Sequence, residues 1–168
     1  MKLKDLPNER GDIIQTFITI DNAISMIISK HYLGDSPNSS SRINKEIDFL
    51  INVMGNDQCT FALKRNVLQH ILRIDNLDAS LLEELNRVNS LRKTFAHRPW
   101  ITIENPQTPE SEIYYQNSKF PRDRNKNILA EDLKKEYYLL TPDIINWLYD
   151  LARRKGYNFP ILPTQANN

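Results

Sequence analysis

The sequence has little cysteine and little glycine, and each shortage excludes a kind of protein. Cys59 is the only cysteine among 168 residues, so neither an internal disulfide nor a site built of several thiolates can form. The four glycines stand singly, and the chain has no glycine-rich loop of the kind that binds nucleotide phosphates. No pair of histidines has the spacing of a helical zinc site. We therefore expect no metal and no other cofactor.

The chain also lacks long apolar runs and has almost no net charge. No stretch is apolar and uncharged over the ~18 residues that a membrane span needs, and Met1 leads into no signal-like segment. We therefore expect a cytoplasmic protein with no membrane contact. The formal net charge is +1, which gives no general attraction to nucleic acid, so an RNA partner would need a local basic patch.

Apolar residues recur at helical spacings of three and four over most of the chain. The length suits a single domain over 1–168, with a core of about 8–157 and a loose tail over 158–168. Five helices are expected, and their apolar faces are, in chain order, Ile13, Phe17, Ile20, Ile24 and Ile27; Ile43, Ile47, Leu50 and Met54; Leu63, Val67, Ile71 and Ile74, flanked by Leu68 and Leu72; Leu81, Leu85, Val88, Leu91 and Phe95; and Ile144, Ile145, Leu148, Leu151 and Ala152.

Capping signals predict where these helices begin and end. Capping boxes are expected at Asp12 for the first helix and at Ser80 for the fourth. A left-handed residue at Gly55 or the asparagine after it would end the second helix. Thr141 is expected to cap the last helix, with Pro142 at its first position.

The segment before the last helix has the alternation and turn residues of a small β-hairpin. Its strands are expected around Ile101–Ile103 and Glu112–Gln116. The stretch Tyr137–Leu140 is either a third strand or the approach to the last helix. The predicted fold class is all-α, a helical bundle of about five helices with a small β-hairpin insertion before the last helix.

The end of the fourth helix carries the strongest candidate for chemistry. Arg92 precedes His97 by five residues, which places the two about 140° apart on an ideal helix. Pro99 ends the helix just after His97, and the long arginine side chain can reach along the helix axis. We expect Arg92 to be partly covered by the apolar stripe beside it. A guanidinium with an imidazole suits phosphate chemistry, whereas the alternative is that both only complement the carbonyls of a helix end.

The six residues from Arg92 to His97 read RKTFAH, an Arg-x4-His motif at the end of a leucine-bearing helix. With the helical architecture, this motif resembles the HEPN family, and the Phe-Ala-His ending is similar to its mannitol operon repressor subset. The resemblance implies a HEPN-like bundle that pairs its motif helices across a two-fold axis. Many members of this family are metal-independent RNases, and others are inactive dimerisation, ligand-binding or regulatory modules.

The resemblance implies a role for each residue of the motif. His97 would be the general acid or base that helps a ribose 2′-hydroxyl attack the adjacent phosphate, and Arg92 would stabilise the charge on phosphorus. Active members commonly carry a small polar residue, often asparagine, directly after the arginine, where this chain has Lys93. Asn89 is a candidate replacement for that amide. The main hypothesis is an endoribonuclease of the toxin or phage-defence type, and the alternative is a non-catalytic regulatory or partner-binding module.

RNA would be held by polar and basic residues of two segments. Those at the motif helix are Asn89, Lys93 and Arg98, and those in the basic stretch Lys119–Lys126 are Lys119, Arg122 and Arg124. The alternative for the basic stretch is an ordinary solvated loop. The expected partners are a second copy of the chain, RNA, and an antitoxin or regulatory protein.

Overall fold

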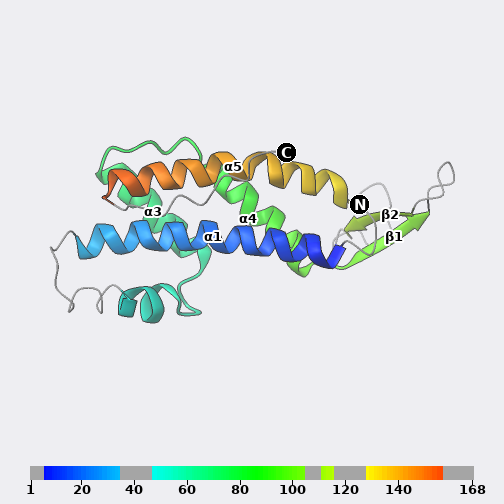
Figure 1. The fold of residues 1–168 in the computed structure, drawn as a ribbon, viewed down its shortest axis with the longest axis horizontal. Coiled ribbons are helices and arrows are strands. Elements are labelled where there is room, and N and C mark those ends of the chain that lie inside the picture. The colour runs from blue at the N-terminus through cyan, green and yellow to red at the C-terminus, as the bar shows by residue number, and fades with distance from the viewer. Residues whose placement is uncertain (1–5, 35–46, 105–110, 116–127, 157–168) are drawn as a thin grey trace. The chain divides into compact units, whose positions relative to one another are not determined.

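The computed structural model of the protein describes residues 6–34, 47–104, 111–115 and 128–156. Helices dominate, and one small antiparallel sheet precedes the last helix (Figure 1). In chain order the elements are α1 (Leu6–Leu33), η2 (Phe49–Met54), α3 (Phe61–Ile74), α4 (Leu82–His97), β1 (Trp100–Glu104), β2 (Ser111–Tyr115), β3 (Ile128–Leu129) and α5 (Ala130–Arg154). This confirms the predicted mainly helical class with a small β insertion. Among these residues, no helix combines the length and apolarity needed to cross a membrane.

The chain forms two compact units, and α1 and α5 each contribute to both. The first unit comprises Met1–Thr19 and Glu83–Ile144, and the second comprises Ile20–Leu82 and Ile145–Asn168. Buried apolar side chains of the first unit include Leu6, Ile13, Phe17, Leu85, Val88, Leu91, Phe95, Ile113, Tyr115, Leu133, Tyr137 and Ile144. Those of the second include Ile20, Ile24, Ile27, Leu68, Ile71, Leu72, Trp147, Leu148 and Leu151. The predicted apolar face of the first helix is therefore confirmed along its whole length.

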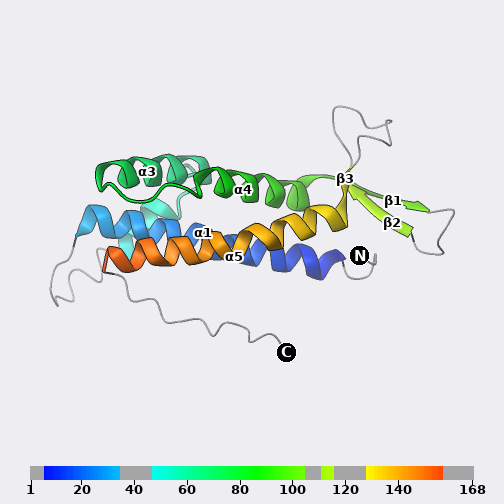
Figure 2. The ribbon, with the colours of Figure 1, turned by 90° about the horizontal axis from the view of Figure 1, so that it is seen from above.

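The sheet belongs to the first unit and has three strands in the order β1-β2-β3 (Figure 2). β1 and β2 form the predicted hairpin, in which Trp100 lies opposite Tyr115. The third strand was not predicted at its observed place: β3 pairs with the end of β2, where Leu129 lies opposite Tyr114. The alternative of a strand over Tyr137–Leu140 is wrong, because that stretch lies within α5.

The last helix begins at Ala130, well before the predicted start at Thr141. Contacts with α1 hold the added turns: the Tyr137 hydroxyl donates to the Ile13 carbonyl at 2.9 Å. Pro142 lies inside the helix, where it lacks the N–H that would otherwise donate one turn back. Thr141 does not cap the helix but donates its hydroxyl to the Tyr137 carbonyl at 2.5 Å. Tertiary contacts therefore override both the strand-forming residues and the proline signal.

Removal of the Tyr137 hydroxyl tests these contacts. Tyr137 is completely buried, so Tyr137→Phe keeps the apolar packing and loses one hydrogen bond across helices. We expect the free energy of unfolding in urea to fall by about 1 kcal/mol. Tyr138→Phe is the matched control, because Tyr138 is exposed and its replacement should change the value little. Equal losses in the two variants would contradict the role of the hydroxyl.

Two predicted capping boxes are not formed. Asp12 lies inside α1, which begins at Leu6, and its carbonyl accepts from the Thr16 hydroxyl. The Ser80 hydroxyl donates to the Asp78 carboxylate at 2.9 Å, and α4 begins two residues later. The two helices were therefore predicted correctly, but α1 begins earlier than predicted and α4 begins without the Ser80 capping box.

The second predicted helix is present in its described part, but it has π geometry over η2. The Gly55 N–H donates to the Leu50 carbonyl at 2.9 Å, the five-residue span of π geometry. Gly55 has φ −83°, so the predicted left-handed residue at this end is wrong. Of the predicted face, Met54 is buried and Ile47 is 49% exposed, while Ile43 lies outside the described residues.

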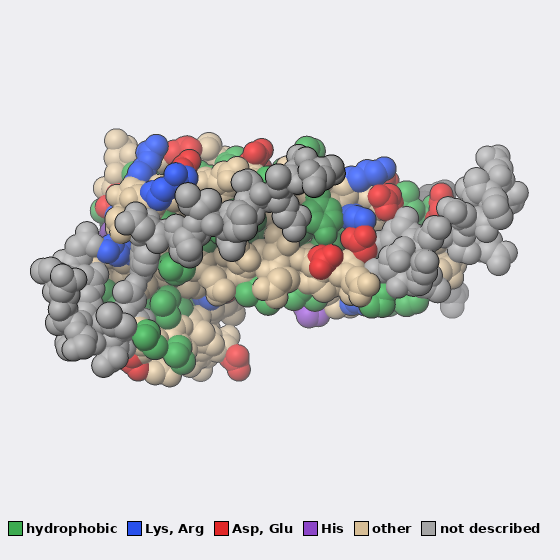
Figure 3. Space-filling model, viewed as in Figure 1, with side chains coloured by type: hydrophobic (Ala, Val, Ile, Leu, Met, Phe, Trp, Pro, Cys, Tyr) green, Lys and Arg blue, Asp and Glu red, His purple; other side chains and the backbone are tan. Residues whose placement is uncertain are grey.

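Apolar side chains are exposed over η2, among polar and acidic ones (Figure 3). Ile51 and Val53 are exposed there together with Ile47. The predicted face of α3 is confirmed in part: Ile71 and the flanking Leu68 and Leu72 are buried, whereas Leu63 and Ile74 are exposed. The α3 side chains that are buried are Lys64, Leu68, Ile71 and Leu72. The buried face of α3 therefore includes a lysine.

An ion cluster in the second unit gives stability a pH dependence. Lys155 donates to the Asp75 carboxylate, and His31 Nδ1 lies 3.2 Å from it. The hydrogen bond from Lys155, and then the charges of Lys155 and His31, lower the pKa of Asp75. Because the pKa is lower in the folded state, this stabilisation is present above the ordinary aspartate pKa and is lost as pH falls through the lowered value.

Replacement of Asp75 should therefore change the acid side of the stability curve. Asp75→Asn is expected to be less stable than the wild type at neutral pH and to lose less stability on acidification toward about pH 3. Urea unfolding at a series of pH values measures both differences. Asp143→Asn, at an exposed site on α5, is the matched control, and a pH profile identical to the wild type for Asp75→Asn would contradict the expectation.

Candidate active site at the end of α4

The candidate site lies at the C-terminal end of α4 in the first unit. The helix ends at His97 as predicted, and Trp100 begins β1 after Pro99. Two bonds satisfy carbonyls of its last turn: the Arg98 N–H donates to the Thr94 carbonyl at 3.1 Å, and Arg10 Nη2 donates to the Ala96 carbonyl at 2.7 Å. α1 thus supplies a cation to the negative end of the α4 dipole.

Arg92 is half-buried, as predicted, and its guanidinium is held on two sides. Its Cζ lies 4.4 Å from the centroid of the Phe17 ring, within the range of a cation–π contact. Its Nη2 donates to Asn89 Oδ1 at 3.2 Å. Nε is buried and has no hydrogen-bond partner among the described residues. The plane of the guanidinium is therefore fixed against α1, and one buried N–H donor stays unmatched.

His97 and Lys93 lie on the solvent side of α4. Both are exposed, and their four-residue spacing places them on one face of the helix. Within the described part of the chain, no hydrogen bond joins Arg92 to His97. This agrees with the roughly 140° between these positions. One copy of the chain therefore presents an exposed imidazole and, around the helix from it, a half-buried guanidinium.

Arg98 directly follows α4 and lines a cavity of about 260 Å³. Its lining residues are Arg87, Ser90, Leu91, Thr94, Arg98, Ile128, Asp132, Leu133 and Glu136. Arg87 Nη2 donates to Glu136 Oε2 at 2.6 Å, and this hydrogen bond raises the pKa of Arg87 and lowers that of Glu136. Arg98 has no ion-pair partner among the described residues, so its charge is available to an anion.

Tyr115 lies beneath the end of the helix at the close of β2. Its ring meets Phe95 edge-on at 5.2 Å between centroids. Burial raises the pKa of Tyr115 to about 12, and the Arg10 charge opposes this shift. Its buried hydroxyl has no hydrogen-bond partner among the described residues. Tyr115 is therefore neutral near pH 7 and serves mainly as packing under α4.

Sequence reasoning found the motif but missed the residues that hold it. Phe17 was predicted as core and not as the support of Arg92, and Arg10 was not predicted at all. Their spacing carried a signal, because Arg10, Ile13 and Phe17 share one face of α1. Lys119, Arg122 and Arg124 lie outside the described residues. The described residues include no group of three His, Cys, Asp or Glu side chains that could hold a metal ion.

Comparisons with protein-family models, curated proteins and solved structures found no match for this chain. The resemblance to the HEPN family therefore stays a prediction.

Proposed function

We propose that the protein is a HEPN-type, metal-independent endoribonuclease that acts as a two-fold homodimer through α4. The observation that supports this most is the fixed, half-buried guanidinium of Arg92 on the same helix as the exposed imidazole of His97. A guanidinium that is held in place costs little ordering when a phosphate binds, and its fork of donors matches two phosphate oxygens.

His97 supplies the proton transfer in this proposal. Its imidazole takes the proton of a ribose 2′-hydroxyl while that oxygen attacks the adjacent phosphorus. The bond to the 5′-oxygen of the next nucleotide breaks, and that oxygen leaves with the proton that the imidazolium gives back. The products are a 2′,3′-cyclic phosphate and a 5′-hydroxyl. Arg92 stabilises the additional negative charge of the five-coordinate phosphorus, and Asn89 keeps Arg92 oriented.

A second copy completes the site, because Arg92 and His97 of one chain face different directions. Antiparallel pairing of two α4 helices across a two-fold axis would place both motifs along one seam. Lys93 and Arg98 would then lie beside the seam and bind flanking phosphates of the RNA. The basic residues Lys119, Arg122 and Arg124 are proposed to extend this contact.

The solution mass tests the need for a second copy. We expect sedimentation equilibrium to give twice the mass of 19.7 kDa at micromolar concentrations. Lys93→Glu should shift the equilibrium if Lys93 lies at the seam, whereas Arg73→Glu, on the exposed side of α3, should not. A protein that stays strictly monomeric at all concentrations would contradict the shared site.

The second candidate function is a non-catalytic regulatory or partner-binding module of the mannitol-repressor kind. Lys93 favours it, because this exposed lysine follows Arg92 where active HEPN members commonly carry a small polar residue. In this case Arg92 is a support for the interface with an antitoxin or regulatory protein. Incubation with single-stranded RNA in EDTA separates the two candidates: cleavage supports the ribonuclease, and an intact RNA after prolonged incubation at high protein concentration supports the regulatory module.

A further inference from the structure

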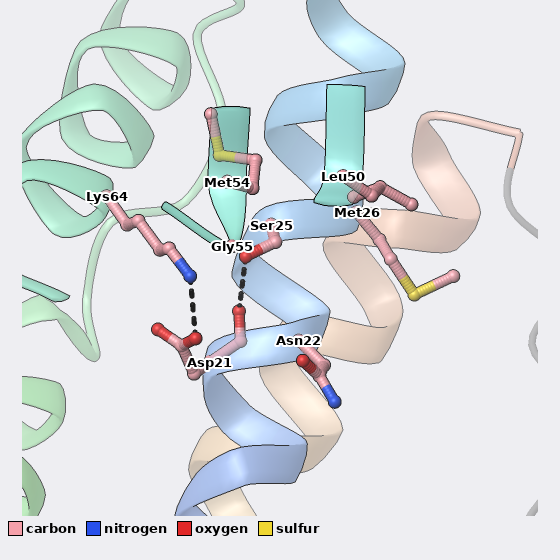
Figure 4. A pocket seen from close by; sticks show the side chains of 8 residues that line it. All are labelled: Asp21, Asn22, Ser25, Met26, Leu50, Met54, Gly55 and Lys64. Carbon is pink, nitrogen blue, oxygen red and sulfur yellow. Dashed lines mark hydrogen bonds and ion pairs between the residues drawn. The ribbon is translucent and has the colours of Figure 1, made fainter. Parts of the chain in front are cut away.

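We propose that the second unit contains a binding site for a small, neutral ligand that carries an amide-like group on an apolar body. The site is a cavity of about 290 Å³ between α1, the end of η2 and the start of α3 (Figure 4). Its lining residues are Asp21, Asn22, Ser25, Met26, Leu50, Met54, Gly55 and Lys64. This proposal is independent of the ribonuclease proposal.

The ion pair in the wall sets the charge of the ligand. Lys64 Nζ lies 2.6 Å from Asp21 Oδ2, and Lys64 is only 6% exposed. Figure 4 shows the lysine reaching from α3 to the carboxylate on α1. The pair is neutral as a whole, so a charged ligand would bring an unmatched charge next to the nearly buried Lys64, at a cost in free energy. A neutral ligand avoids this cost.

Unused hydrogen-bonding groups in the wall set the chemistry of the ligand. Lys64 has three N–H donors, and within the described residues only Asp21 accepts from it. The Ser25 hydroxyl donates to the Asp21 carbonyl at 2.9 Å and keeps its lone pairs as acceptors. Both the Lys64 donors and the Ser25 hydroxyl therefore lie next to Asp21. An amide matches them, because its carbonyl accepts from Lys64 while its N–H groups donate to Asp21 or Ser25.

Apolar side chains provide the rest of the cavity. Met26, Leu50 and Met54 form this part, and methionine adapts its shape to different ligands. Gly55 closes the wall, where an added Cβ would lie 2.7 Å from the Ile51 carbonyl oxygen. The volume lies near the lower end of the ~300–1,000 Å³ typical of ligand sites. A ligand with a short apolar chain therefore fits better than a drug-sized one.

Three probes with the same apolar chain test the preference for a neutral ligand on the full-length protein: hexanamide, hexanoate and hexylammonium. Each is titrated while the backbone amide shifts are followed by NMR. We expect saturable shifts around Ser25 and Met54 with hexanamide, and at least about tenfold weaker binding of both charged probes. Absence of saturable hexanamide binding, or equal affinity for the three probes, would overturn the proposal.

A change of charge in the wall of the cavity should shift the ligand preference from the neutral to an anionic probe. Asp21→Asn leaves Lys64 without its counter-ion, so hexanoate should bind at least about tenfold more tightly than to the wild type. Asp57→Asn, at an exposed site, is the control and should rank the affinities of the three probes as the wild type does. If Asp21→Asn does not fold, Met26→Phe keeps the ion pair and reduces the cavity. Met26→Phe should lose hexanamide binding. Hexanamide binding that is retained in Met26→Phe would overturn the proposal, as would an order of affinities for the three probes that Asp21→Asn leaves unchanged.

Discussion

Replacement of His97 by alanine is expected to lower the rate of RNA cleavage by ~10²–10⁴, the usual contribution of a positioned acid or base. The imidazole is exposed and has no hydrogen bond within the described chain, so its loss should change the free energy of unfolding by less than about 0.5 kcal/mol. A large loss of activity in an equally stable protein would assign the imidazole to chemistry. Single-turnover cleavage of a labelled RNA, together with urea unfolding, gives both values.

His70→Ala is the matched control for this experiment. His70 is also exposed, but it lies on α3 in the second unit, so cleavage by His70→Ala should equal that of the wild type. Equal cleavage by His97→Ala and the wild type would falsify the catalytic role. A loss of activity in both variants would indicate a general effect of histidine replacement.

Replacement of Arg92 by lysine should lower cleavage by ~10²–10³, the effect of removing a group that stabilises developing charge. Lysine keeps a positive charge but has no planar fork, so it cannot bind two phosphate oxygens at once. The contact with Phe17 and the bond to Asn89 are weakened as well. Because the change also removes a buried Nε without a partner, we expect a loss of stability of only about 1 kcal/mol.

The rate of RNA cleavage and the free energy of unfolding together show whether Arg92 has a catalytic or a structural role. Arg73→Lys, at an exposed site on α3, serves as the control for the chemical change. If Arg92→Lys cleaves RNA as fast as the wild type but unfolds more easily, Arg92 is a packing residue of α1 and α4. If cleavage falls and the loss of stability stays small, the guanidinium acts on the phosphate.

The sequence predicted the helices that are organised around a regular apolar stripe. In α1 and α4, the residues at spacings of three and four are those that are buried, including Ile13, Phe17, Val88 and Phe95. Such a stripe is a local property, and one buried face is enough to produce it. The end of α4 could also be predicted from the local sequence, because Pro99 alone stops regular helical geometry.

The sequence failed where contacts between distant segments decide local structure. Thr141 and Pro142 have the pattern of a helix start, yet the buried Tyr137 bonds to α1 and extends α5 to Ala130. In the second unit, Met54 is buried, but the helix around it has π geometry. The early start of α5 is accompanied by the tertiary hydrogen bond of Tyr137, whereas the π geometry of η2 is visible only in its local bond from Gly55 to Leu50.

The same limit applies to the candidate site. The pattern of one helix was enough to expect a partly covered Arg92, because Leu91 and Phe95 of the apolar stripe lie next to it. It could not name Phe17 or Arg10 as the groups that contact the end of α4, since both come from the other end of the chain. The lysine on the buried face of α3 was missed for a similar reason: its counter-ion, Asp21, lies on α1.

The most direct test of the proposed activity is the chemistry of the RNA ends that the purified protein leaves in EDTA. The account predicts 2′,3′-cyclic phosphates opposite 5′-hydroxyls, measured by mass spectrometry, and no cut at a position where the ribose is replaced by 2′-deoxyribose. Intact RNA, 3′-hydroxyl ends, or cleavage beside the 2′-deoxyribose would contradict it, because each excludes attack by the 2′-hydroxyl.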